Sequence, residues 1–203
     1  MSSWVLPAFL GLGLAAACGF RTFLPLLVLG AAAHFGVLGL DLNESFAWIG
    51  STGALLTLSV AAAAEILGDL IPFIDNMLSL IGNVSGPIAG AIAAGSVFEA
   101  ADPATAAIAG IIVGAPTALT FSATQTGVRA ASTATTGGIA NPVVSVVEDV
   151  LAFVLVAVAI VLPLLVPIVL GALLFVAWRA VRRFRSRKSA SARPVVAPPA
   201  RSR

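Results

Sequence analysis

The stretch Cys18-Gly19-Phe20-Arg21-Thr22-Phe23-Leu24-Pro25 places one cation near the middle of an otherwise unbroken apolar run, residues 5–35. As a helix, this run would be about 46 Å long and would exceed a hydrocarbon core of about 30 Å. An arginine near the centre of a spanning helix costs at least about 2.5–3.5 kcal/mol, so it normally faces a partner or water inside a bundle. Gly19 and Pro25 flank Arg21, and we therefore predict that the helix breaks at the charge.

The overall composition is typical of a membrane protein. Hydrophobic residues make up 59% of the 203 residues and charged residues 10%, with a mean hydropathy of +1.07. A soluble domain carries about 25% charged residues, so this chain lacks the polar surface needed to face water on all sides. We expect an all-α, polytopic transmembrane helical bundle over residues 1–180, with roughly five spans, some of them broken or re-entrant.

The basic residues are concentrated at the C-terminus. Nine of the eleven lie in residues 179–203, and only Arg21 and Arg129 precede them. By the positive-inside rule we expect a cytoplasmic C-terminus, with residues 181–203 forming a basic, disordered tail whose partner is anionic lipid. Nucleic-acid binding is not expected, because this tail lacks a fold and interleaved aromatic residues.

Acidic residues occur inside the second predicted span, residues 51–71. Glu65 and Asp69 lie one helical turn apart in it and so share one face. Because two neighbouring carboxylates disfavour full ionisation of both, this pair is a candidate site for a proton or a small cation. The alternative for Asp69 is a place at the membrane interface. The alternative for Arg21 is a buried structural pair with Glu65 or Asp69.

The middle of the chain has three short or polar segments. We expect residues 72–98 to form either a re-entrant hairpin or an interfacial helix followed by a half-span, because their apolar stretches are too short to cross. Asp102-Pro103 is a typical N-cap and first-turn pair, which predicts a third long span over about 103–124. Residues 120–138 contain eight Ser or Thr residues and form either a loop in water or an unwound cavity wall. Arg129 in this segment is expected to extend to an interface.

A further helix is predicted after Asn141-Pro142, where Ser145 and Glu148 have the spacing of a capping box. Glu148 and Asp149 would then lie in its first turn, where the macrodipole explains them without a ligand. The alternative is a place for both in a substrate or ion pathway. Residues 147–177 are otherwise apolar and contain two prolines, so we expect either one long kinked helix or two short spans.

The sequence also contains a weak internal repeat. A shift of 108 positions aligns Gly19-Phe20-Arg21 with Gly127-Val128-Arg129, and each half adds an acidic pair at the edge of an apolar helix. Such symmetry is what a duplicated transporter-type fold leaves. A chain rich in Gly and Ala also produces matches of this kind by chance.

Three stretches carry a family resemblance: GLGLAAACGFRTFLPLLVLG at 11–30, AEILGDLIPFIDNMLSLIG at 64–82 and NPVVSVVEDVLAF at 141–153. Over roughly residues 5–180 the chain resembles the bacterial inner-membrane family catalogued as domain of unknown function 4126. Leu70 stands where a typical member has lysine. The resemblance implies a multi-pass protein of the bacterial inner membrane and brings no established reaction or substrate.

The signatures of common catalytic sites are missing from the sequence. It contains no H-E-x-x-H, G-x-S-x-G, P-loop or dinucleotide fingerprint, so we expect neither an enzyme nor a cofactor or metal site. The leading hypothesis is a transporter or channel in the lipid bilayer for a small anion, a proton or a cation. Its candidate pathway residues are Arg21, Glu65, Asp69, Arg129, Glu148 and Asp149. The alternative is a structural or accessory membrane protein whose buried charges are packing pairs. For either function, a homo-oligomer is one of the assemblies considered.

Overall fold

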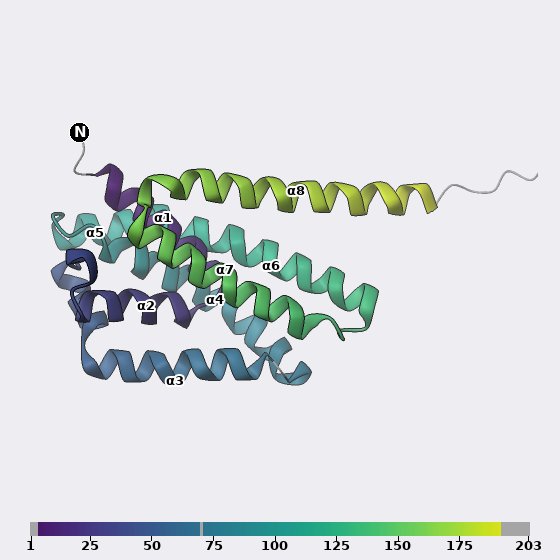
Figure 1. The fold of residues 1–203 in the computed structure, drawn as a ribbon, viewed down its shortest axis with the longest axis horizontal. Coiled ribbons are helices and arrows are strands. Elements are labelled where there is room, and N and C mark those ends of the chain that lie inside the picture. Colours follow the sequence, from purple (N-terminus) through teal and green to yellow (C-terminus); the bar gives the residue numbers. More distant parts are fainter. Residues whose placement is uncertain (1–3, 70, 192–203) are drawn as a thin grey trace, which may run out of the picture. The chain divides into compact units, whose positions relative to one another are not determined.

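The computed structural model describes the backbone of residues 4–69 and 71–191, and the side chains of residues 4–69, 71, 81–179 and 182. Every regular element in these ranges is a helix, as the composition predicts (Figure 1). The α-helices are α1 (Val5–Phe20), α2 (Phe23–His34), α3 (Thr52–Gly68), α4 (Pro72–Ser96), α5 (Pro103–Ala109), α6 (Ala115–Thr136), α7 (Asn141–Val161) and α8 (Val166–Ser191). Shorter helical turns are the 3-10 turns η1 (Val37–Gly39), η2 (Glu44–Gly50) and η4 (Pro163–Leu165) and the π-helical turn η3 (Gly110–Gly114).

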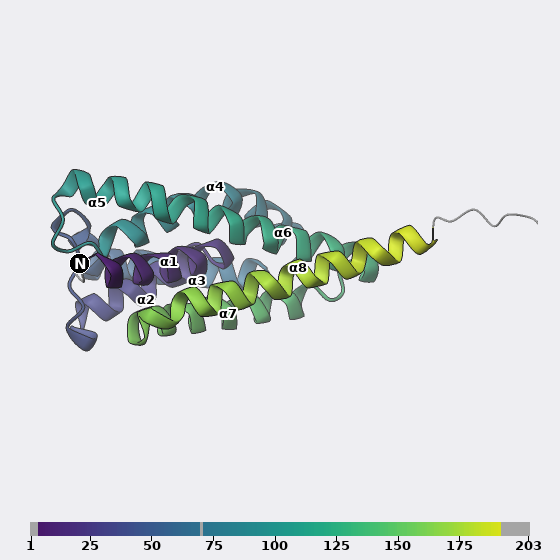
Figure 2. The same ribbon diagram turned by 90° about the horizontal axis from the view of Figure 1, so that it is seen from above.

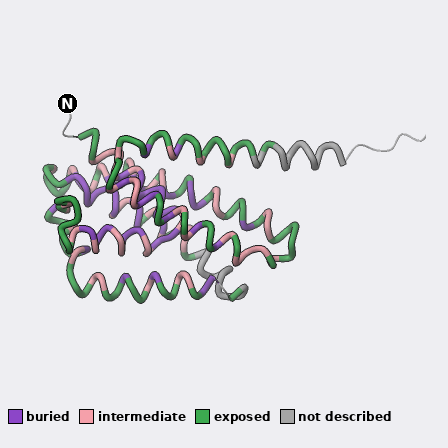
Figure 3. The backbone as a smooth tube through the Cα atoms, in the orientation of Figure 1, coloured by how far each residue is buried: buried purple, intermediate pink, exposed green. Residues whose placement is uncertain are grey.

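Two compact units, residues 1–168 and residues 169–203, make up the chain. In the first unit α1 lies at the centre and packs against α4, α6 and α7 (Figures 1 and 2). Residues 13–19 of α1 are all buried, and buried residues gather where these helices meet (Figure 3). Because these seven positions hold only Gly, Leu, Ala and Cys, the neighbouring helices can approach the backbone of α1 closely.

Glycines also bring α4 into contact with the helix formed by η3 and α6. A Cβ added to Gly90 would lie 2.6 Å from the Cβ of Ala118, and one added to Gly114 would collide with the Gly90 carbonyl oxygen. Gly86 lies beside Cys18 of α1 in the same way. The small residues at 86 and 90 therefore lie at helix contacts, which is what their four-residue spacing predicts.

By length and composition, two helices among the described residues could cross a membrane, Pro103–Thr136 and Asn141–Val161. The first combines α5, η3 and α6 and starts at the predicted cap, where Asp102 Oδ1 accepts a hydrogen bond from Thr105 N at 3.1 Å. A third crossing is added if η2 and α3, which are bent by 62°, form one broken span. α1 and α2 are shorter apolar helices. The number of roughly five spans stays a prediction.

α4 is one continuous helix, so the hairpin predicted for residues 72–98 is wrong, and the half-span stays a prediction. Pro87 lies inside this helix without ending it, and Gly82 and Asn83 are also helical. Asn83 Oδ1 accepts a hydrogen bond from the Thr126 hydroxyl of α6 at 3.2 Å. Packing against α1 and α6 outweighs the low helix propensity of these residues, because propensity is only a weak preference.

The hydroxyl-rich segment 120–138 is helical as far as Thr136, so neither a loop in water nor an unwound wall is found there. Five of its eight hydroxyls donate to carbonyl oxygens one turn back in the same helix, which leaves the helical backbone bonds in place. These bonds, at 2.8–2.9 Å, run from Thr120 to Pro116, Thr124 to Thr120, Thr126 to Ser122, Thr135 to Ala131 and Thr136 to Ser132. Gly137 then ends the helix in the left-handed conformation, with a φ of 63°.

α7 begins at Asn141, one turn before the predicted start, with Pro142 in its first turn. The predicted capping box is therefore wrong, and Ser145 and Glu148 lie inside the helix. A proline is well suited to the first turn because it lacks the amide hydrogen that would have no partner there. At Leu162 the backbone leaves the helical conformation (φ −138°, ψ 58°), and η4 separates α7 from α8, so two helices replace the single kinked one.

The second unit contains α8 from residue 169 onward, and α8 is helical as far as Ser191. The tail predicted over residues 181–203 therefore begins within a helix, and residues 192–203 lie outside the described part of the chain. Near the start of the basic region Trp178 packs against Phe175, with ring centroids 5.9 Å apart. The guanidinium carbon of Arg182 lies 5.0 Å from the centre of the Trp178 ring, within the range of a cation–π contact.

Candidate functional site

The break between α1 and α2 falls at Arg21, as the flanking glycine and proline predict. Arg21 has an extended backbone (φ −140°, ψ 125°), and its amide donates a hydrogen bond to Ala17 O at 2.9 Å. Just before the break, Gly19 lies against α6, where an added Cβ would be 2.5 Å from the carbonyl oxygen of Ala118. The break thus holds Arg21, only 2% exposed, inside the bundle.

Glu65 of α3 caps the N-terminus of α2. One carboxylate oxygen accepts a hydrogen bond from Thr22 N at 2.7 Å, and the other accepts one from Phe23 N at 3.1 Å. The first amides of a helix have no partner within it, and the helix macrodipole places partial positive charge there. The carboxylate charge of Glu65 is therefore stabilised by the backbone of α2.

Replacing Glu65 by Ala is expected to lower the free energy of unfolding by about 1–2 kcal/mol, because two amides at the start of α2 lose their acceptors. Glu65→Gln keeps one side-chain oxygen and should lose less. Thermal unfolding of the purified protein in detergent measures both changes. Glu99→Ala, at an exposed acid, is the matched control, and equal stability of the two Ala variants would show that the cap contributes nothing.

The guanidinium group of Arg21 contacts side chains from α7 and from the end of α3. It forms an ion pair with Asp69, the residue after α3, and its Nε lies 2.6 Å from Asp149 Oδ1. Its Nη2 donates hydrogen bonds to the hydroxyl of Ser145 at 2.6 Å and to the Ser145 carbonyl oxygen at 3.3 Å. Of the two pairs considered from the sequence, with Glu65 or with Asp69, the ion pair is formed with Asp69.

Arg129 of α6 is 8% exposed, so the expectation that it extends to an interface is wrong. Its Nη2 lies 2.7 Å from Asp69 Oδ2. Its Nε donates to Glu148 Oε2 at 3.1 Å, and Nη2 makes a closer contact with the same oxygen. Gln125, one turn earlier on α6, donates to Glu148 Oε2 at 2.8 Å. Carboxylates inside the bundle thus provide the compensating charge that an interface would otherwise provide.

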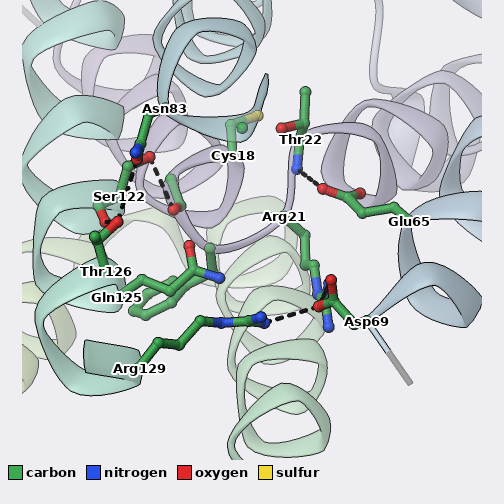
Figure 4. Close-up of a pocket in the computed structure, with 13 residues that line it drawn as sticks. Cys18, Arg21, Thr22, Glu65, Asp69, Asn83, Ser122, Gln125, Thr126 and Arg129 are labelled. Carbon is green, nitrogen blue, oxygen red and sulfur yellow. Dashed lines mark hydrogen bonds and ion pairs between the residues drawn. The ribbon is translucent and has the colours of Figure 1, made fainter. Parts of the chain in front are cut away.

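Asp69 joins the two arginines. Its Oδ2 contacts both guanidinium groups (Figure 4). The same oxygen accepts a hydrogen bond from the Ser145 hydroxyl at 2.9 Å. Asp69 is 6% exposed and therefore buried among the helices, and its place at the membrane interface stays a prediction. We call the continuous series that the described side chains form, Asp149, Arg21, Asp69, Arg129 and Glu148, the five-charge network.

The five-charge network is not neutral when all its members are ionised, because three carboxylates then face two guanidinium groups. The sequence contains no other Arg or Lys before Arg179. An uncompensated charge inside an apolar bundle is costly, so a proton or a small cation would stabilise the network.

A pocket of about 40 Å³ opens beside the network at the helix break (Figure 4). At about 10–15 Å³ for each water, it has room for about three water molecules or one small ion. Its polar wall consists of Arg21, Thr22, Glu65, Asp69, Asn83, Ser122, Gln125, Thr126 and Arg129. All six residues selected from the sequence therefore lie either in the network or in the wall of this pocket.

Sequence reasoning misses Ser145, Gln125 and Asn83 as site residues. Gln125 lies four residues before Arg129, a spacing that indicates a shared face once the segment is known to be helical. Ser145 has the same spacing to Asp149, whereas nothing in the local sequence indicates Asn83. Among the side chains that the structure describes, no group of three or more His, Cys, Asp or Glu is arranged to hold a metal ion.

The internal repeat aligns two arginines that do meet in one network. Arg21 lies at a helix break, however, whereas Arg129 lies inside the continuous helix α6. The duplication stays a prediction. Leu70, at the position where the family resemblance leads us to expect a lysine, lies outside the described residues.

A family model described as "Domain of unknown function (DUF4126)" matches residues 8–183. This range contains the five-charge network, Glu65 and the pocket. Comparisons with curated proteins and with solved structures find no match.

Proposed function

The chain belongs to the family described as domain of unknown function 4126, and from its buried charges we propose that it is a transporter or channel for a small solute or ion. The pathway passes through the pocket at the α1–α2 break. One observation carries the proposal: a charged network with an excess carboxylate lies among apolar helices, and three of its members, Arg21, Asp69 and Arg129, line a pocket of about 40 Å³. Ionisable groups are rare in such helices, and in membrane proteins they mark ion and proton routes.

The size and lining of the pocket favour a proton or a small cation as the transported species. A volume of about 40 Å³ leaves little room for an organic anion. The guanidinium groups of Arg21 and Arg129 already contact carboxylates, so they are poorly placed to attract a further anion. The excess negative charge attracts a cation instead.

The proposal also covers the membrane in which the protein lies and its orientation there. The protein is a multi-pass protein of the bacterial inner membrane with the lipid bilayer as its main partner. The C-terminus is cytoplasmic, and the basic residues after Trp178 contact anionic lipid. The protein acts without enzymatic turnover or a cofactor.

Solid-supported-membrane electrophysiology on proteoliposomes tests the proposal, with jumps of pH, Na⁺, K⁺ and a panel of small organic anions. We expect a current on proton or cation jumps that is lost in Asp69→Asn and kept in Arg179→Gln, which removes a charge outside the network. A pH-sensitive dye inside the vesicles detects electroneutral exchange. Equal flux in folded Asp69→Asn protein, or no flux of protons or cations in the folded parent protein, would contradict the proposal.

A structural or accessory role is the second candidate. It is favoured by the observation that every member of the network contacts an oppositely charged neighbour. A buried ion network of this kind can hold helices in register without carrying anything across a membrane. This candidate predicts a folded parent protein without flux in the same vesicle assay.

A further inference from the structure

The three carboxylates of the five-charge network are stabilised unequally. Asp69 contacts both arginines and one hydroxyl, and Glu148 accepts bonds from two nitrogens of one arginine and from the amide of Gln125. Among the described side chains, Asp149 contacts only Arg21, through Nε at 2.6 Å. Neither atom of that pair has a hydrogen-bond partner, so the Nε–H bond does not point at the carboxylate. Asp149 is therefore the carboxylate whose negative charge is least compensated.

We propose that Asp149 is the proton-binding group of this protein, an inference that deepens the proposed function and rests on it. The network contains one more carboxylate than it has guanidinium groups, and the proton binds to this extra carboxylate. With Asp69 and Glu148 ionised and Asp149 protonated, two negative charges face two positive ones and the network is neutral. A neutral network avoids the cost of an unpaired charge among apolar helices.

Charged groups reach the surroundings of Asp149 from several elements. α7 packs against α1, α2, α6 and η4, and η4 brings no titratable residue. The titratable groups to consider, from the α1–α2 segment, the end of α3, α6 and α7 itself, are Cys18, Arg21, His34, Asp69, Arg129 and Glu148. His34 lies at the far end of α2 and contacts the carbonyl oxygen of Gly50. The two arginines favour an ionised Asp149, but each is already paired with another carboxylate.

Asp149 is accessible to protons from water because its side chain is partly exposed. The Asp149 side chain is 23% exposed, whereas those of Asp69 and Glu148 are 4% and 5% exposed. A proton from water can therefore add to an Asp149 oxygen while the rest of the network stays closed. Arg21 then keeps Asp69 and Ser145 as partners and loses its ionic contact with Asp149. Arg21 lies where the backbone breaks between α1 and α2. Protonation of Asp149 therefore weakens one of the contacts that hold this break against α7.

Infrared difference spectroscopy of the full chain in lipid tests this assignment. The pH is stepped from about 5.5 to about 9, above the range in which exposed Asp and Glu titrate. The parent protein is expected to show the carbonyl stretch of a protonated carboxylic acid, which disappears as the pH rises. The band should be absent in Asp149→Asn and present in Glu65→Gln, which removes a carboxylate of the pocket outside the network.

Asp149→Glu keeps the proposal testable if Asp149→Asn does not fold. This variant retains a carboxyl group at the position, so its band should appear at a shifted frequency. Three results would overturn the assignment: no titrating band in the parent protein, an unchanged band in Asp149→Asn or Asp149→Glu, or loss of the band in Glu65→Gln.

Proton binding and transport are separated by this design. If the parent protein shows the Asp149 band but no flux in the vesicle assay, the result supports Asp149 as the proton-binding group and contradicts the transport function. Flux in the parent protein together with an unchanged band in Asp149→Asn supports transport and overturns Asp149 as the proton-binding group.

Discussion

Arg21→Gln is expected to lower the free energy of unfolding by about 3–5 kcal/mol, the cost of removing one partner from a buried ion pair. The substitution leaves Arg129 as the one guanidinium group of the network against three carboxylates. Asp149 loses its contact in the network, and Asp69 and Ser145 each lose a partner. Thermal or chemical unfolding of the purified protein in detergent, followed by circular dichroism, measures the loss.

Matched variants separate charge balance from the number of contacts. Asp69→Asn leaves two carboxylates against two arginines, so it should cost less than Arg21→Gln although each of the two side chains contacts three residues. Adding Asp149→Asn to Arg21→Gln should recover part of the loss, because one uncompensated carboxylate is removed. Arg179→Gln should change stability by no more than about 0.5 kcal/mol. A larger loss for Asp69→Asn than for Arg21→Gln would show that charge balance does not govern the network.

Gly19→Ala is expected to destabilise the fold by about 2–3 kcal/mol, in the range for overpacking of a tight contact. The new Cβ would lie 2.5 Å from the Ala118 carbonyl oxygen and 2.7 Å from the Cβ of Phe121. Both atoms are fixed by the backbone of α6, so α1 has to move away, and Arg21 two residues later moves with it. Unfolding in detergent measures the loss.

Gly127→Ala is the matched control for this substitution. Gly127 lies in α6, and an added Cβ there meets no atom within 4 Å. Alanine is favoured over glycine inside a helix by about 0.8–1.0 kcal/mol, so this variant should be slightly stabilised. Equal effects of the two substitutions would contradict the close contact between α1 and α6.

Local features of the sequence were sufficient for part of the fold. The apolar composition predicts an all-helical chain, and the break at Arg21 follows from Gly19 and Pro25 beside a charge that an apolar helix does not accommodate easily. Asp102 was predicted as an N-cap because its side chain reaches an amide three residues later, a contact that depends on local geometry alone. The shortage of cations before Arg179 is likewise a property of the sequence, whatever the fold.

Intrinsic helix propensity led to wrong predictions where tertiary packing favoured a helix against it. The hydroxyl residues of segment 120–138 predicted a loop or an unwound wall, and the short apolar stretches of segment 72–98 predicted a hairpin, yet both segments are helical. Their hydroxyls bond within the helix, and their small residues allow α1, α4 and α6 to touch. Ser145 illustrates the same limit. Its spacing to Glu148 fits a cap, but Pro142 sets an earlier helix start, and the hydroxyl contacts Arg21 and Asp69 instead.

The sequence by itself determined that two arginines and several carboxylates must share an apolar bundle, and that one break falls at Arg21. Only the tertiary structure decided which charges meet, because Arg21 lies 48 residues from Asp69 and 124 from Ser145, and no local pattern acts over such separations. The choice of ion-pair partner depends on which helices pack against α1 and on how far along its axis they contact it. A buried charge gains its stability from a neighbour that this packing brings within contact distance.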